Sequence, residues 1–151
     1  MASIELVTVL RMDHVGIVVD DLAAATAFFL ELGLQPHGEA SVEGEWVDRL
    51  LALDGVRADI AMLATPDGHG RVELARFRAP RARDGAPDAT ANAPGLRHLT
   101  FAVDDIDGTV ARLRAHGAEL LGPIENYRGI YRLCYLRGPE GIIVELAEPL
   151  D

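Results

Sequence analysis

The chain consists of two related halves, and this internal duplication constrains its fold more than any other feature. The segment from His14 to Leu22 recurs from His98 to Ile106 with polar and apolar residues in the same order. Near the end of each half the residues Val-Glu-Leu-Ala occur, at 72–75 and at 144–147. Repeated units of this size usually bury their apolar faces against each other. We therefore expect two similar modules around one core.

Hydrophobic periodicity predicts the same order of elements in both halves. Alternating residues predict a strand over 12–19 and its repeat over 97–103. A helix follows each strand; the first begins at Asp20 or Asp21 and ends at Gly33, and the second begins at Asp104 or Asp105 and runs to His116. Further strands are expected near 35–42, 57–64 and 71–78, and near 119–122, 130–137 and 141–148, with a helical turn at 47–53.

This order makes the chain an α+β protein of two βαβββ modules. The modules span residues 10–79 and 97–149 and belong to one domain over 1–151. Residues 80–96 are rich in Ala, Pro, Arg and Asp without periodicity, which predicts a linker.

Composition excludes several classes of function. A net charge of -10 would repel a nucleic acid backbone. Long apolar runs are missing, and Met1 to Leu10 lacks the features of a signal peptide, so we expect no membrane contact and a cytoplasmic protein. The chain has no Lys, which excludes a Schiff base and a Walker-type phosphate loop. The one cysteine, Cys134, is interpreted as an ordinary strand thiol.

The two halves each contribute one His and one Glu to a face lined by small residues. His14 and His98 alternate with apolar residues of the first strand of each module, and Glu73 and Glu145 do so in the last strand. Each of these four side chains taken alone is most simply a surface or satisfied residue. Together, two imidazoles and two carboxylates match the ligand set of one divalent transition metal, such as Zn, Ni, Co, Mn or Fe.

The same residues resemble the vicinal oxygen chelate superfamily, which includes glyoxalase I, methylmalonyl-CoA epimerase, extradiol dioxygenases and bleomycin-resistance proteins. The resemblance rests on Asp-His-Val-Gly-Ile-Val-Val-Asp-Asp-Leu at 13–22 and Gly-Pro-Glu-Gly-Ile-Ile-Val-Glu-Leu at 138–146. It implies that the modules form a curved mixed sheet, a half-barrel cup with the helices outside. It also implies a homodimer and a metal site with the ligands His14, Glu73, His98 and Glu145.

Within that superfamily, a complete His, Glu, His, Glu set looks most like glyoxalase I. The resemblance implies a metal-dependent lyase or isomerase that acts on a small molecule, with Glu145 as the first choice of base and Glu73 on the opposite side of the metal. Glyoxalase I usually continues after the first Glu with Thr-His-Asn, whereas this chain continues with Leu74-Ala75-Arg76. The glutathione contact of that Asn is therefore not expected here.

The substrate pocket is predicted from aromatic and apolar residues. Tyr131, Leu133 and Tyr135 share one face of a strand, which the resemblance turns toward the pocket, although plain packing would explain the tyrosines equally well. Trp46 and Met62 are candidates for the pocket mouth, and Trp46 could instead cover a loop.

Two other functions remain open. A metal-free protein that binds a drug or metabolite, as bleomycin-resistance proteins do, would have little use for two inward Glu residues. An iron-dependent dioxygenase is disfavoured by the fourth ligand, Glu73.

Overall fold

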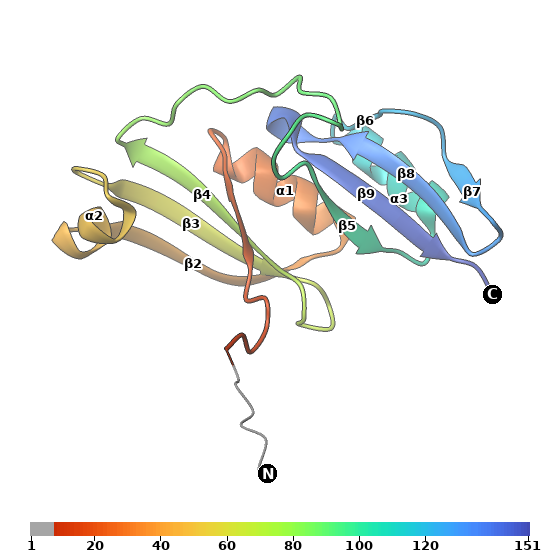
Figure 1. The fold of residues 1–151 in the computed structure, drawn as a ribbon, viewed down its shortest axis with the longest axis horizontal. Coiled ribbons are helices and arrows are strands. Elements are labelled where there is room, and N and C mark those ends of the chain that lie inside the picture. The colour runs from red at the N-terminus through yellow and green to blue at the C-terminus, as the bar shows by residue number, and fades with distance from the viewer. Residues whose placement is uncertain (1–7) are drawn as a thin grey trace, which may run out of the picture.

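The computed structural model describes residues 8–151, and these form two mixed sheets (Figure 1). Each sheet belongs to one module, which confirms the α+β class and the two βαβββ units. In the first sheet the strand order is β1-β4-β3-β2, and in the second it is β5-β9-β8-β6, with β7 paired to β8. No strand of one sheet is hydrogen-bonded to a strand of the other within the described residues.

The element bounds agree closely with the periodicity of the sequence. The first module contains β1 (Val15–Val18), α1 (Leu22–Leu32), β2 (Gln35–Glu43), α2 (Glu45–Leu51), β3 (Arg57–Ala64) and β4 (Arg71–Ala79). The second contains β5 (His98–Ala102), α3 (Ile106–Ala115), β6 (Glu119–Leu120), β7 (Glu125–Tyr127), β8 (Tyr131–Arg137), the 3-10 turn η1 (Pro139–Gly141) and β9 (Ile143–Pro149). Asp21 and Asp105 cap α1 and α3 through their side chains, as predicted.

One strand, β7, was not predicted. It is three residues long and joins β8 through a turn in which Arg128 and Gly129 have φ values of 53° and 68°. Arg-Gly is not one of the residue pairs that usually signal such a turn. Tyr127 and Tyr131 are therefore partners across a hairpin.

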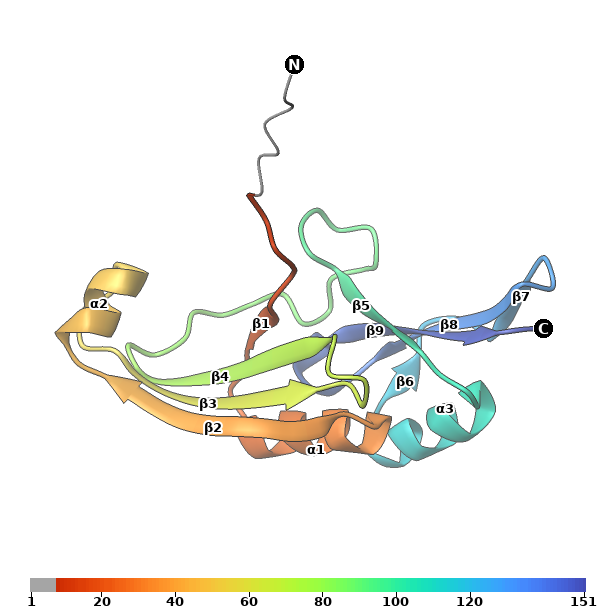
Figure 2. The ribbon, with the colours of Figure 1, turned by 90° about the horizontal axis from the view of Figure 1, so that it is seen from below.

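Helices α1 and α3 lie together on the same side of both sheets (Figure 2). The sheet residues that face them are apolar, and one buried cluster joins the two modules. Phe29 of α1 approaches Phe101 of β5, with ring centroids 6.3 Å apart. The largest fully buried side chains are Phe28, Phe29, Leu63, Leu74, Ile106, Leu113, Leu136, Leu146, Val19, Val56 and Val144. Burial of this surface holds the modules together.

A polar contact adds to this packing at the start of α1. The carboxylate of Glu140, from η1 of the second module, accepts hydrogen bonds from the backbone N–H groups of Asp20, at 2.6 Å, and Asp21, at 2.9 Å. Gly138 beside it packs on Phe28 so closely that an added Cβ would lie 2.9 Å from the ring. The turn before β9 is thus fastened to the first module.

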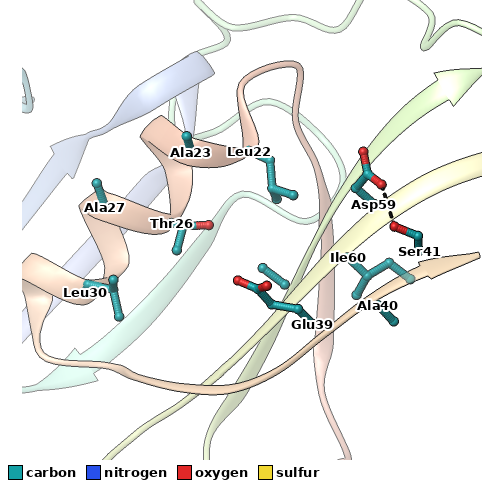
Figure 3. A pocket seen from close by; sticks show the side chains of 11 residues that line it. Leu22, Ala23, Thr26, Ala27, Leu30, Glu39, Ala40, Ser41, Asp59 and Ile60 are labelled. Atoms are coloured by element: carbon teal, nitrogen blue, oxygen red, sulfur yellow. Dashed lines mark hydrogen bonds between the residues drawn. The ribbon is translucent and has the colours of Figure 1, made fainter.

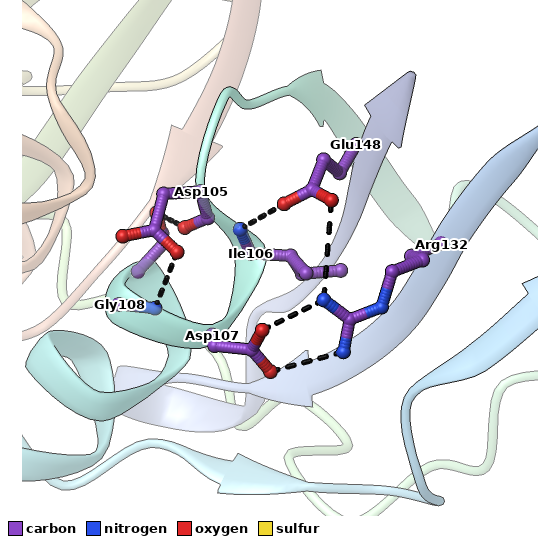
Figure 4. Close-up of polar contacts among 7 residues, drawn as sticks. Asp105, Ile106, Asp107, Gly108, Arg132 and Glu148 are labelled. Atoms are coloured by element: carbon purple, nitrogen blue, oxygen red, sulfur yellow. Dashed lines mark hydrogen bonds and ion pairs between the residues drawn. The ribbon is translucent and has the colours of Figure 1, made fainter. Parts of the chain in front are cut away.

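The start of α3 is stabilised from within its own module (Figure 4). Glu148 of β9 accepts a hydrogen bond from the Ile106 N–H at 2.8 Å, while Arg132 of β8 donates to both oxygens of Asp107, at 2.7 and 3.0 Å. The hydrogen bond from Arg132 holds the pKa of the Asp107 carboxyl below its ordinary value. The two carboxylates at this helix start also suit the positive end of the helix dipole.

The connection between the modules is anchored by Arg137. Its guanidinium donates to the carbonyl oxygens of Pro87, at 2.8 Å, and Ala89, at 2.9 Å.

No helix in the described part of the chain is long and apolar enough to cross a membrane. Most of the segment on which the signal-peptide expectation rests, residues 1–7, lies outside the described residues.

The Glu140 contact predicts a measurable loss of stability. Glu140→Ala leaves two backbone N–H groups at the start of α1 without their acceptor, so the free energy of unfolding should fall by about 1 kcal/mol, as for loss of a helix cap. Urea unfolding measures the change. Asp84→Ala, which removes the same charge from the exposed linker, is the control; equal values for both variants would contradict the assigned contact.

Candidate metal centre

Strand register places one His and one Glu together on the first sheet. Strands β1 and β4 are parallel, and Gly16 lies opposite Glu73. His14 precedes β1 by one residue and shares the face of Gly16. Its Nε2 atom lies 3.5 Å from Glu73 Oε2. The sequence-predicted pair is therefore brought together by the structure.

The other ring nitrogen of His14 is bound to Asp13. His14 Nδ1 lies 2.8 Å from Asp13 Oδ2, and Arg11 approaches the second oxygen of this carboxylate at 3.3 Å. The hydrogen bond with His14, assisted by Arg11, holds the pKa of the Asp13 carboxyl below its ordinary value. An ionised carboxylate only accepts, so Nδ1 of His14 carries a proton, and this hydrogen bond orients the ring with Nε2 toward Glu73. An imidazole nitrogen and a carboxylate that face each other in this way form a ligand combination that suits a divalent transition metal.

The second sheet carries the equivalent pair. Thr100 of β5 lies opposite Glu145 of the parallel strand β9. His98 Nε2 is 3.8 Å from Glu145 Oε1, and the Thr100 hydroxyl donates a hydrogen bond to the same oxygen at 2.7 Å. Imidazole and carboxylate again lie side by side, with Thr100 as an additional partner.

Tyr135 is the predicted pocket residue that lies nearest to this second pair. It is the partner of Glu145 across β8 and β9, and its ring meets the His98 ring edge to face at 5.0 Å between centroids. Burial, followed by the neighbouring Glu145 carboxylate, raises the pKa of Tyr135. The phenol is therefore protonated at neutral pH and available as a hydrogen-bond donor.

The other predicted pocket residues differ in their distance from the pairs. Met62 of β3 is the direct partner of Glu73 and is half-buried, so it borders the first pair. Leu133 shares the face of Tyr135, and Tyr131 lies at the far end of the same strand with 38% exposed surface. Trp46 lies on α2, donates to the Glu43 carbonyl at 3.1 Å and is 55% exposed. The structure does not bring it to either pair.

The two pairs remain separate within one chain. Among residues 8–151, no three His, Cys, Asp or Glu side chains lie close enough together to hold a metal ion. A small cleft of about 200 Å³ lies where the modules meet, lined by Asp13 and His14 on one side and by Leu99 and Thr100 on the other. Convergence of all four ligands on one ion stays a prediction.

A larger groove lies on the helix side of the first sheet, away from the pairs. It has a volume of about 820 Å³ between α1 and strands β2 and β3 (Figure 3). Its walls include Leu22, Leu30 and Ile60, and the Ser41 hydroxyl donates to Asp59 at 2.8 Å at its rim. No candidate ligand lines it.

Sequence reasoning missed Asp13 and Thr100, which contact the predicted ligands. A comparison of the two halves could have identified both, because the residues at corresponding positions differ. Asp13 corresponds to Arg97, and Thr100 corresponds to Gly16. Cys134, interpreted as an ordinary strand thiol, is buried in β8, and burial raises its pKa to about 11, which keeps it from acting as a thiolate.

Comparison with known proteins agrees with this architecture. Residues 13–135 match the family model of the Glyoxalase/Bleomycin resistance protein/Dioxygenase superfamily, and the chain belongs to that family. It is 31% identical over 139 residues to the protein YaeR of Escherichia coli (strain K12), covering 91% of this chain and 95% of YaeR.

A solved structure shares both sequence and fold. The glyoxalase family protein from Bacillus cereus is 48% identical, with a TM-score of 0.94 over 99% of this chain and 100% of that one. A mutant of the fosfomycin resistance protein FosX of Listeria monocytogenes, solved with Mn(II) and dihydroxypropylphosphonic acid, is 14% identical with a TM-score of 0.58, over 93% of this chain and 90% of that one. This last likeness shows the fold alone.

Proposed function

We propose that the protein is a metal-dependent lyase or isomerase that acts on a small molecule bearing adjacent oxygen atoms. The proposal rests on two matching His–Glu pairs, one pair on each sheet. In the first pair, His14 Nε2 lies 3.5 Å from Glu73 Oε2. The chemistry of the donors fits a divalent transition metal such as Zn, Ni, Co, Mn or Fe. His14, Glu73, His98 and Glu145 would hold it.

The proposed reaction is the transfer of a proton at a carbon atom next to a carbonyl group. A bound divalent metal supplies positive charge that stabilises the negative oxygen of an enediolate or enolate. The protein supplies carboxylates on both sides: Glu73 and Glu145 can accept a proton at one oxygen and return it, provided that the carboxylate loosens from the metal. Tyr135 offers a neutral phenol as donor, and Met62 and Leu133 contribute apolar walls.

The substrate is not predicted to be a glutathione adduct held as in glyoxalase I. Leu74 and Ala75, which follow Glu73, are buried, and Arg76 is exposed on β4. None of them offers the amide contact that the resemblance would require.

We also propose that the complete centre forms in a homodimer. Within residues 8–151 of one chain, the two candidate ligand pairs do not come together in a cluster of three or more metal-binding side chains. A twofold dimer could bring the first pair of one copy to the second pair of the other, because such an interface repeats every contact twice.

Metal titration tests the proposed function. The native protein should bind Co(II) or Zn(II), as measured by calorimetry. Loss of a residue that only hydrogen-bonds a metal ligand typically weakens metal binding 10–100-fold, so His14→Ala and His98→Ala, which remove ligands, should each weaken it by at least that factor. Asp13→Asn should weaken binding by about 10-fold, since it removes the charge that holds Nδ1 of His14. His37→Ala and Asp104→Asn are matched controls without an expected effect. A native protein that binds no metal would contradict the proposal and favour a metal-free binding protein.

Mixing two variants tests the shared centre. His98→Ala keeps the first pair intact, and His14→Ala keeps the second. When the two chains are unfolded together and refolded, tight sites should reappear at about a quarter of the level of the native protein, because half of the dimers are mixed and each has one complete site. Tight binding should be missing from each variant alone. Failure of the mixture to recover any tight site would show that the centre is not shared between copies.

A further inference from the structure

The duplicated modules differ at the residue that faces each candidate carboxylate ligand. Two positions after its His, the first module has Gly16 and the second has Thr100. Strand register places Gly16 opposite Glu73 and Thr100 opposite Glu145. The two carboxylates therefore occupy equivalent positions with different neighbours.

Glu145 is held by its surroundings. The Thr100 hydroxyl donates to its Oε1 atom at 2.7 Å, and Tyr135 is its neighbour on the other side, in β8. Only 16% of the Glu145 side chain is exposed. A donated hydrogen bond from a residue in a regular strand fixes the carboxylate before any ligand binds.

Glu73 has no such partner. Within the described part of the chain, no protein group donates a hydrogen bond to its side chain, which makes an ion-pair contact with His14 Nε2 at 3.5 Å. The side chain is 27% exposed. A Cβ atom added at Gly16 would lie 4.0 Å from Glu73 Oε1, in ordinary van der Waals contact, so an alanine fits there without a clash.

We propose that Thr100 is a positioning residue that makes Glu145 the fixed carboxylate ligand of the centre and leaves Glu73 as the mobile one. This inference rests on the proposed function. A fixed carboxylate loses little conformational freedom when it binds a metal, whereas a mobile one can detach and take up a proton. The assignment places Glu73 ahead of Glu145 as the proton carrier, the opposite of the order that the family resemblance implies.

Substitutions at the two equivalent positions test the inference through metal affinity, without any substrate. Thr100→Val keeps the shape of the side chain and removes the hydroxyl, so Co(II) should bind about 10-fold more weakly, as for loss of an outer partner. Thr100→Ser restores the donor and should recover native affinity. Gly16→Ala is the matched control: it adds a carbon beside Glu73 without a donor and should change nothing.

The two carboxylates should also differ when each is replaced. Glu145→Gln should weaken Co(II) binding more than Glu73→Gln, because the fixed ligand contributes more to affinity. The reverse order, or native affinity in Thr100→Val, would overturn the inference while leaving the proposed function intact. A native protein that binds no Co(II) would overturn both.

A measurement on the metal-free protein checks the contact itself. Urea unfolding of Thr100→Val, Glu145→Gln and the double variant should give non-additive changes in stability, because the two side chains share one hydrogen bond. The same experiment shows whether each variant folds. Strictly additive changes would contradict the role given to Thr100.

Discussion

The candidate site depends on one structural constraint, the parallel pairing of the first and last strands of each module. In β1 and β4 this register sets Gly16 against Glu73, and in β5 and β9 it sets Thr100 against Glu145. Because residues alternate between the faces of a strand, a slip of one position would turn both carboxylates toward the helices. The apolar residues that follow the two carboxylates in sequence, Leu74 and Leu146, are fully buried on the opposite face of their sheets. Core packing therefore fixes which face carries the polar residues.

Divergence between the two halves has made the pairs chemically different. In the first module the His is held by Asp13, and the Glu accepts no hydrogen bond from any protein group among residues 8–151. In the second module the Glu is held by Thr100, and the His rests against the edge of Tyr135. An identical repeat would have supplied two equal pairs. The observed differences give each of the four predicted ligands its own surroundings, on which separate roles in binding and proton transfer can be based.

Local pattern predicted most of the fold and the composition of each pair. Alternation identified the strands that hold Glu73, His98 and Glu145 and the strand that directly follows His14, and the capping aspartates marked where the helices begin. Matching positions in the two halves then implied which His accompanies which Glu. These features depend on neighbours a few residues apart or on a repeat, so one sequence is enough to show them.

Other features depend on contacts that local pattern does not encode. Glu140 reaches the start of α1, about 120 positions away, because Gly138 allows η1 to approach Phe28. The short strand β7 depends on a turn at Arg128 and Gly129 without a characteristic residue pair. The separation of the two pairs within one chain depends on how the two modules pack against each other. That packing is set by the helices, which form the shared core, and by the linker. Periodicity could predict each half of the site but not the distance between the halves.

If His14, Glu73, His98 and Glu145 form one metal centre, as we propose, X-ray absorption of the Zn-loaded protein should detect all of them around one ion. The first shell should consist of nitrogen and oxygen at about 2.0–2.2 Å, with the scattering of two imidazoles. His14→Ala and His98→Ala should each remove one of these imidazoles. A spectrum with one imidazole or none in the native protein, or one left unchanged by either substitution, would contradict the claim.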